Sequence, residues 1–310
     1  MPLPTQSDVA TDEHVFLIGR PPIAEYLGFV EQTLGGRDAN RQELVDEWRA
    51  ANDHIQELEL TEAGLADSPP IVDLTGKLRT LADELLGDPL VQRNFAIVPV
   101  GVGSVELDRL VVFQKNINLD YVDYLTELLG ESPTRHKMFR FALPTDRRYD
   151  VPVQSMQIAQ NGWVFTSPSM DFRPLQSTVL SGDAVPGLTL DGVPAAVVAA
   201  PVGYGSNFLS AIHANGRLIL NNGSHRAYTL RAAGHTHAPC LIQTVSRIDE
   251  LHAIASGEVT ANVDAYLSAP RPPMLKDYFD ERLRMVGELP RRVRQVRVVV
   301  NYEQVDAPGS

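Results

Sequence analysis

Apolar residues recur along the first 130 residues with the spacing of helices. The longest such series consists of Leu44, Trp48, Ala51, Ile55 and Leu58. Steps of four and three residues place these side chains on one stripe of a helix, which Asp38 or Asn40 can cap at its start. Two shorter series predict helices over 74–85 and 119–129, each ended by a glycine. This part of the chain is therefore predicted to be mainly helical.

The pattern changes near residue 140, where prolines become frequent and short apolar runs alternate with turns. The pair Asn161-Gly162 is typical of a hairpin turn, and Gly234 marks the end of a helix predicted over 224–233. The apolar stretch 95–103 is either a short strand or a buried loop. Strands are predicted near 151–158, 163–165, 194–202, 217–221, 240–245 and 296–302. The third of these is expected to be buried, because it is apolar almost throughout.

Together these patterns predict an α+β fold, with a helical region at 1–140 followed by a mixed α/β domain at 141–310. The net charge of −12 arises at the start of the chain: residues 1–90 hold 18 acidic and 6 basic side chains, whereas residues 91–310 hold 21 of each. This balance argues against a nucleic-acid partner, which requires a basic surface. The acidic helices are expected to face solvent, another protein or a second copy of the chain.

Three absences bear on the cellular context. Cys240 is the only cysteine, so an intramolecular disulfide is excluded. The amino-terminal residues lack the basic and apolar regions of a secretory signal. The longest nearly apolar run, 193–203, falls short of the ~20 residues that span a membrane. We expect a cytoplasmic protein without a membrane partner.

The stretch 215–241 carries the strongest chemical signal. It reads as a strand, a glycine turn at Asn222-Gly-Ser-His-Arg226, a helix, a glycine stop and a second strand entered through a proline. A helix start attracts anions, Gly223 permits a close approach of the backbone, and the Arg226 guanidinium matches phosphate or carboxylate. The turn is therefore either a ligand site or an ordinary helix start, capped by Ser224, whose arginine pairs with a carboxylate.

This stretch resembles the ParB/sulfiredoxin-like superfamily, in which a strand leads through Gly-x-His-Arg into a short helix that ends in glycine. The matching residues are Gly223, Ser224, His225, Arg226, Ala227, Leu230, Ala233, Gly234 and Pro239. The resemblance implies that the turn from Asn222 to Arg226 binds nucleotide phosphates. Ser224 stands where sulfiredoxins have a catalytic cysteine, so their reductase chemistry is not expected. The helix-turn-helix region of chromosome-partition proteins is not evident either.

Two other segments offer candidate partners for that turn. The glycine loop 203–207 follows a predicted strand, and its Tyr204 and Asn207 either line the same pocket or belong to an ordinary tight loop. Asp171 or Asp146 is a candidate general base or Mg²⁺ ligand, with a solvated loop charge as the alternative.

Two further groups have the side chains of a metal site or a charged surface. His235, His237 and Cys240, together with His225, have metal-ligand chemistry, but this segment also matches a plain return of the chain to the sheet. No metal is expected there. Four arginines near the carboxyl end either guard a strand edge or bind an acidic partner or nucleic acid. They are Arg291, Arg292, Arg294 and Arg297.

We therefore expect a small-molecule enzyme of the phosphotransferase type that binds ATP or another phosphorylated ligand, with Mg²⁺. His225 and Arg226 are the candidates for stabilising phosphate charge, and Asp171 is the candidate base. Two alternatives remain open. One is a ligand-sensing or assembly protein that performs no chemistry, and the other is a metal enzyme built on His225, His235 and His237.

Overall fold

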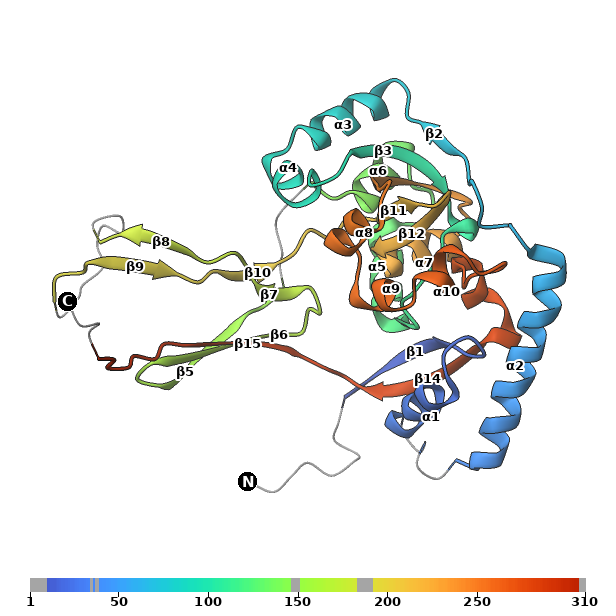
Figure 1. Cartoon of the computed structure of the whole chain (residues 1–310), viewed down its shortest axis with the longest axis horizontal. Helices are drawn as coiled ribbons and strands as arrows, with labels where there is room; N and C mark the ends of the chain where they lie inside the picture. The colour runs from blue at the N-terminus through green and yellow to red at the C-terminus, as the bar shows by residue number, and fades with distance from the viewer. Residues whose placement is uncertain (1–9, 34–35, 37–38, 146–150, 183–191, 307–310) are drawn as a thin grey trace. The chain divides into compact units, whose positions relative to one another are not determined.

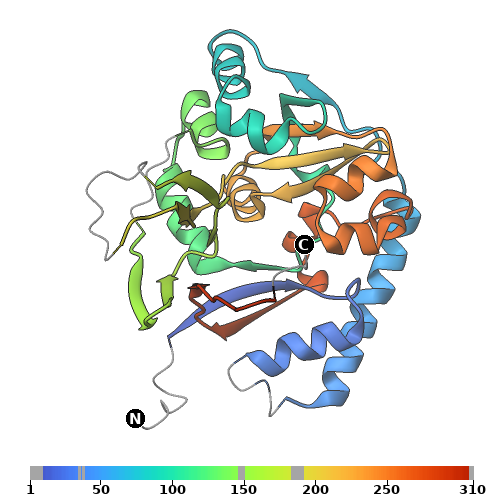
Figure 2. The ribbon, with the colours of Figure 1, turned by 60° about the vertical axis from the view of Figure 1, so that its left-hand side comes forward.

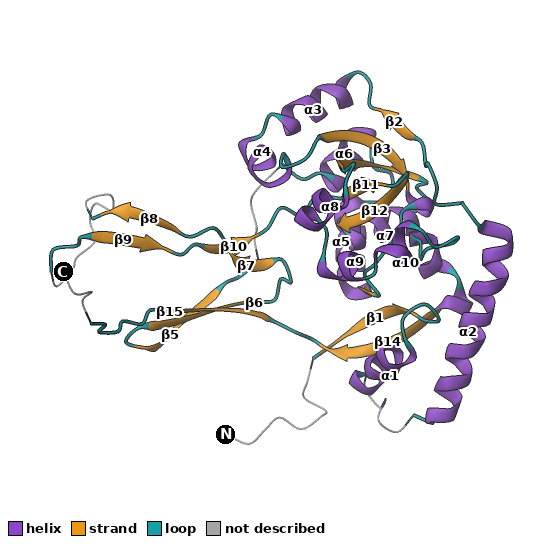
Figure 3. Cartoon of the chain, in the orientation of Figure 1, coloured by secondary structure: helices purple, strands orange, loops and turns teal. Residues whose placement is uncertain are grey.

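The computed structural model has a mixed α+β fold, as the sequence predicts (Figure 1; Figure 3). The structure describes residues 10–33, 36, 39–145, 151–182 and 192–306. Asp146, one of the two candidate bases, lies outside these residues. In the part of the chain that is described, no helix has both the length and the apolar character needed to cross a membrane.

Internal contacts divide the chain into two compact units. Unit 1 comprises Met1–Asp146 and Asn207–Arg291, and unit 2 comprises Arg147–Ser206 and Arg292–Ser310. This division differs from the predicted boundary at residue 140. The chain leaves unit 1 near that position but returns to it at residue 207, so the segment that contains the glycine turn folds with the amino-terminal region.

The principal sheet of unit 1 has five strands in the order β12-β11-β13-β3-β2. They are β2 (Ile71–Asp73), β3 (Val100–Glu106), β11 (Ser210–Ala214), β12 (Arg217–Asn222) and β13 (His237–Thr244). Strands β11 and β12 form a hairpin, and helix α7 (Ser224–Ala232) then leads to β13, which pairs in parallel with β11. Figure 2 shows β11 and β12 in gold beside β13 in orange. Of the stretch 95–103, for which a short strand or a buried loop was expected, only 100–103 lies in a strand, because Phe95 ends α4 and residues 96–99 form a turn.

A second sheet of unit 1 joins segments that are far apart in the chain. Its order is β14-β1-β4, and Figure 1 shows β1 beside β14. Strand β1 (Thr11–Leu17) pairs antiparallel with β14 (Arg284–Pro290) along its whole length, and with β4 (Asn116–Asn118) on its other side. Residues 1–140 therefore supply strands to both sheets of unit 1, in addition to the helices that the sequence predicts.

The three helices predicted in the amino-terminal region are confirmed. Helix α2 (Arg41–Glu62) starts after Asn40, whose side chain accepts a hydrogen bond from the second helical amide. Helices α3 (Lys77–Leu86) and α5 (Leu119–Leu129) are each followed directly by glycine. The remaining α-helices of the described chain are α1 (Ile23–Gln32), α4 (Pro89–Phe95), α6 (Arg135–Ala142), α8 (Ile248–Ile254), α9 (Gly257–Ala261) and α10 (Val263–Leu267).

Helices cover both faces of the β11–β12 hairpin. Leu218 and Leu220 belong to a core shared with α5, α6 and α7, whereas Ile212 and Ile219 belong to a core shared with α8, α9 and α10. A third core packs Phe16 of β1 against α1 and α2. Helix α7 therefore lies within the first core, and its residues are mostly buried.

Unit 2 consists, in its described residues, of three small antiparallel sheets with the orders β15-β6-β5, β10-β7 and β8-β9. The strands are β5 (Gln154–Ala159), β6 (Gly162–Ser167), β7 (Phe172–Pro174), β8 (Thr178–Ser181), β9 (Ala196–Ala199), β10 (Val202–Tyr204) and β15 (Arg294–Val299). The predicted hairpin at Asn161-Gly162 is confirmed. The prediction that 194–202 is a buried strand is wrong, because β9 pairs only with β8 in a narrow ribbon that leaves Val198 71% exposed.

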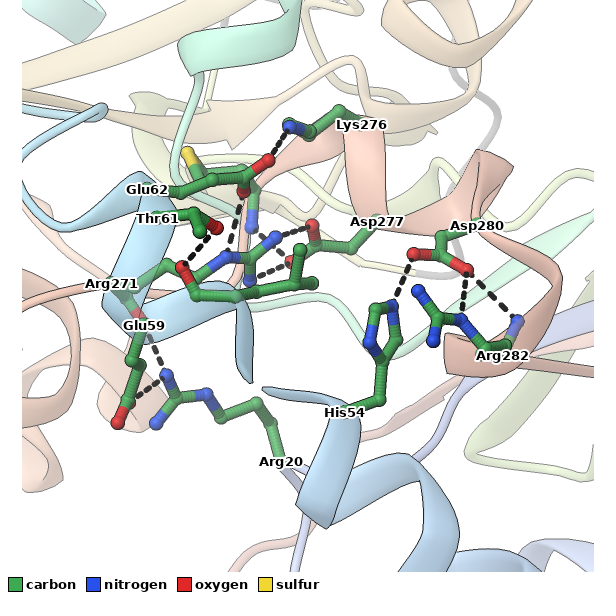
Figure 4. Close-up of polar contacts among 12 residues, drawn as sticks. Arg20, His54, Glu59, Thr61, Glu62, Arg271, Lys276, Asp277, Asp280 and Arg282 are labelled. Carbon is green, nitrogen blue, oxygen red and sulfur yellow. Dashed lines mark hydrogen bonds and ion pairs between the residues drawn. The ribbon is translucent and has the colours of Figure 1, made fainter. Parts of the chain in front are cut away.

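A buried network of charges attaches the end of α2 to the carboxyl-terminal part of unit 1 (Figure 4). The Arg271 side chain is fully buried and donates to both carboxylate oxygens of Asp277, at 2.6 and 3.1 Å. Its Nε donates to Glu62 Oε2 at 3.0 Å, and Lys276 Nζ donates to the other oxygen of Glu62 at 2.5 Å. Each charge removed from water is thereby paired.

Two more polar contacts extend this network along α2. His54 is buried, and its Nε2 lies 2.7 Å from Asp280 Oδ2. Arg20 Nη2 donates to Glu59 Oε1 at 2.6 Å and also to the carbonyl oxygen of Arg271. His54 and Glu62 of α2 thus bind the segment that leads into β14 directly, and Glu59 is linked to it through Arg20.

We expect Arg271→Met to lower the free energy of unfolding by about 3–5 kcal/mol, because it leaves Asp277 buried without its partner. Arg79→Met is the matched control. Arg79 forms an ion pair with Asp83 in which the side chains are 61% and 58% exposed, so its loss should cost less than about 1 kcal/mol. Denaturant unfolding of both variants makes the comparison, and equal costs would contradict the role assigned to Arg271.

Candidate functional site

Strand β12 passes into α7 through one glycine in the left-handed region. Gly223 has φ +83°, and a Cβ there would lie only 2.7 Å from Leu209 Cα. The Leu209 backbone is itself held in place, because its N–H donates to Ala142 O at 2.8 Å and its carbonyl accepts from Leu241 N at 3.0 Å. The Leu209 backbone thus fills the space beside Gly223. The sequence had suggested that a ligand approaches the backbone there.

Helix α7 begins without a side-chain cap, because Gly223 occupies the cap position. Ser224, the predicted cap, is instead the first helical residue and is buried. The first intrahelical bond runs from Ala227 N to Gly223 O at 2.9 Å, and Asn222 Oδ1 accepts from Gly223 N at 2.8 Å. The amides of the first turn and the positive end of the dipole make this helix start favourable for an anion.

Arg226 is buried, and its guanidinium bonds to protein groups. Nη1 donates to Phe141 O at 2.5 Å, and Nε donates to Asn207 Oδ1 at 3.4 Å. The guanidinium carbon also lies 5.2 Å from the centre of the Phe141 ring, within range of a cation–π contact. Two residues predicted for the site, Arg226 and Asn207, are thus in contact. Their bonds connect α7 with the end of α6 and the segment before β11.

His225 takes part in the site as a neutral imidazole. Its Nε2 accepts a hydrogen bond from Asn118 N at 3.0 Å, and its ring packs edge-on against Tyr121 at 5.3 Å. Burial, followed by the nearby His14, lowers the pKa of His225 from 6.5 to about 4. His225 therefore carries no positive charge at neutral pH, in contrast to the guanidinium of Arg226.

Asn118 links His225 to the second sheet. Besides its backbone bond to His225, its Nδ2 donates to Asp12 Oδ2 at 2.9 Å, and its Oδ1 caps α5 by accepting from Tyr121 N at 2.9 Å. Asp12 in turn accepts from Arg291 Nε at 2.6 Å. The sequence gives no signal for the link between Asn118 and His225, because 107 positions separate the two.

A buried hydroxyl lies next to the site in the β11–β12 pairing. Ser210 stands opposite Asn222, at an irregularity in the register between residues 210 and 211. The residue is 1% exposed, and its Oγ makes no hydrogen bond with any described part of the chain. Buried polar groups normally have a partner, so this hydroxyl marks a place where a hydrogen bond can still form.

Two of the predicted site residues, Tyr204 and Asp171, belong to unit 2, whereas residues 222–226 belong to unit 1. The Tyr204 hydroxyl donates to Val151 O at 2.8 Å and lies 3.2 Å from Ser167 Oγ. The backbone carbonyl of Asp171 accepts from Gly205 N at 3.3 Å. These contacts give both residues places in the fold of unit 2, and the catalytic role of Asp171 stays a prediction.

The alternative of a metal enzyme rests on His225, His235 and His237, with Cys240 nearby. Cys240 is fully buried, and burial raises the pKa of its thiol, which disfavours the thiolate that binds metals. Within the described ranges, no group of three or more histidine, cysteine, aspartate or glutamate side chains is arranged to hold a metal ion.

Comparisons of the chain with protein-family models, curated proteins and solved structures found no match. The resemblance to the ParB/sulfiredoxin-like superfamily therefore stays a prediction from residues 215–241. The strand–glycine–helix–strand order read from that stretch agrees with β12, α7 and β13.

We expect Gly223→Ala to destabilise the protein far more than Gly234→Ala. Both glycines have positive φ, +83° and +85°, where a side chain costs about 1–2 kcal/mol. A Cβ at Gly234 would meet no atom within 4 Å, whereas one at Gly223 would collide with the Leu209 backbone. Thermal or denaturant unfolding measures both costs. Similar costs would show that α7 does not need the close approach of Leu209.

We expect His225 to make unfolding pH-dependent. The unfolded chain takes up a proton at this residue near pH 6.5 and the folded chain only near 4. The unfolded state therefore binds more protons in this window, and stability falls as the pH drops through it, by about 3 kcal/mol in total. His225→Gln keeps an acceptor for Asn118 N and should flatten this dependence, whereas the exposed His136→Gln should not. An unchanged pH profile for His225→Gln would refute the assignment.

Proposed function

We propose that the chain binds a small phosphorylated ligand at the start of α7, with ATP as the first candidate and phosphoryl transfer as the reaction class. The observation that carries the proposal is the uncapped helix start behind Gly223. The buried Ser210 hydroxyl opposite Asn222 supports it, since an unsatisfied donor next to a helix start favours an oxygen-rich ligand. The resemblance of residues 223–226 to a phosphate-binding turn points in the same direction.

The residues of the turn contribute to such binding in different ways. The amides of Ser224 and His225 supply hydrogen-bond donors in the first turn of α7. His225 accepts at Nε2, so its ring proton resides on Nδ1 and is a further donor. Arg226 positions the turn through Phe141 and Asn207 and adds positive charge. A Mg²⁺ ion would neutralise phosphate charge during transfer.

A ligand-binding protein without catalysis is the second candidate. The contacts of His225 and Arg226, the two side chains expected to stabilise phosphate charge, favour this candidate. Arg226 bonds to Phe141 and Asn207, and His225 is neutral, so both side chains already serve the fold. Turnover distinguishes the two candidates: ATP bound and consumed identifies an enzyme, and ATP bound but unchanged identifies a sensor or assembly protein.

Asn222→Asp tests the binding site without breaking the turn. Aspartate keeps the acceptor for Gly223 N, and it adds a negative charge at the positive end of α7. We expect the unliganded variant to be as stable as the wild type or slightly more stable, because a carboxylate at a helix start contributes about 0.3–1 kcal/mol. Affinity for a phosphate group should fall about tenfold or more, the effect of a like charge at close range.

Calorimetric titration with ATP, pyrophosphate and inorganic phosphate, with and without Mg²⁺, makes this measurement. Asn94→Asp is the control, because it changes the net charge equally at an exposed position of α4. Loss of affinity in both variants would point to a general charge effect. The absence of binding by the wild type to all three probes would sink the proposal.

A further inference from the structure

Unit 2 has very little interior of its own. Among its described residues, the buried apolar side chains are Val164, Phe172 and Val296. Most of the strongly exposed large apolar side chains of the described chain lie in this unit. They are Val153, Met156, Ile158, Trp163, Met170, Leu175, Val179, Val193, Val198, Val293, Val299, Val300, Tyr302 and Val305. Two- and three-stranded sheets with so few buried contacts are only marginally stable alone, so this unit requires additional cover.

Strand β5 offers an open edge for that cover. In the sheet β15-β6-β5 it pairs with β6 on one side, and no described strand pairs with its other side (Figure 3). Its sequence, Gln-Ser-Met-Gln-Ile-Ala, contains neither a charge nor a proline, and every residue in it is exposed. The opposite edge strand, β15, carries the exposed Arg294 and Arg297. Charges of this kind protect an edge from pairing, and β5 has none.

One face of this sheet is apolar next to the open edge. Met156 pairs with Val164 across the strands. The Ile158 side chain lies over Gly162, and a Cβ added to Gly162 would be 3.1 Å from it. Val299 lies on the same side of Gly162. Met156 is 62% exposed and Ile158 is 42% exposed, so a strand added beside β5 would cover an apolar strip as well as backbone groups.

We propose that a second copy of this chain adds its own β5 to this edge, antiparallel and around a two-fold axis that passes through Met156. Met156 then faces Met156 of the second copy, and Ser155 faces its Gln157. These pairs lie before the bulge that disturbs the register between Gln157 and Ala159. The result is one six-stranded sheet, a common size in globular proteins.

Charge favours a second copy as the occupant. Unit 2 contains six acidic and six basic side chains, so the whole net charge of −12 belongs to unit 1. Two copies that meet at unit 2 bring neutral surfaces together, and the uncharged β5 places no like charges opposite each other. Association through the acidic unit 1 would instead oppose like charges. This pairing does not depend on the phosphate site proposed above.

The mass in solution tests the proposal. Sedimentation or light scattering of the full chain should give twice the monomer mass of 34.1 kDa, and Met156→Lys should return it to the monomer. Val179→Lys is the matched control, because Val179 is a similarly exposed apolar residue on β8 and should leave the dimer intact. Circular dichroism checks that both variants keep the wild-type fold. A monomeric wild type, or a dimer that Met156→Lys leaves intact, overturns the proposal.

Cross-linking tests the register. Residues opposite each other in an antiparallel pair have Cα atoms about 4.5–5.5 Å apart, which suits a disulfide. Met156→Cys should therefore form a covalent dimer on mild oxidation, whereas the wild type should not, since Cys240 is fully buried. Val179→Cys is the control for collisional cross-linking. Efficient cross-linking of Val179→Cys, or none of Met156→Cys, contradicts the pairing at β5.

Discussion

The buried pairing of Arg271 with Asp277 constrains how unit 1 closes. A guanidinium and a carboxylate without access to water are tolerated only while they face each other and their remaining groups are bonded. Asp277 meets this condition by also accepting from Met274 N, and Arg271 meets it through Glu62 at the end of α2. The segment 271–277 is therefore held in a fixed position against α2. The chain that follows it leads into β14, which pairs with β1.

This constraint reaches the candidate site through a short series of contacts. Directly after Asp277, the fully buried Tyr278 donates a hydrogen bond to the carbonyl of Gln114, just before β4. Strand β4 ends at Asn118, whose amide donates to His225 in the first turn of α7. The position of the glycine turn thus depends on contacts from segments on both sides of it in the sequence, as well as on its own hairpin.

The sequence predicts what local rules determine. The apolar spacing within residues 119–129 and the following Gly130 are both local signals, so the limits of helix α5 follow from the pattern. Strand β1 carries no comparable local signal, because its pairing with β14 joins the two ends of unit 1. At the site, the sequence pointed to the glycine turn and to Asn207 as a neighbour of Arg226, and the two side chains are in contact. It did not find that burial keeps His225 neutral, or that the distant amide of Asn118 donates to its ring.

The placement of the last two strands has a consequence for the order in which the protein is made. Strand β14 completes the sheet that contains β1, and β15 completes the sheet that contains β6. Both strands follow every other described strand in the order of the chain. A nascent chain emerges from its amino terminus, so β1 and β6 leave the ribosome long before their partners exist. Each unit therefore has an incomplete sheet until β14 or β15 has been synthesised, and removing these two strands would leave both sheets without a partner strand.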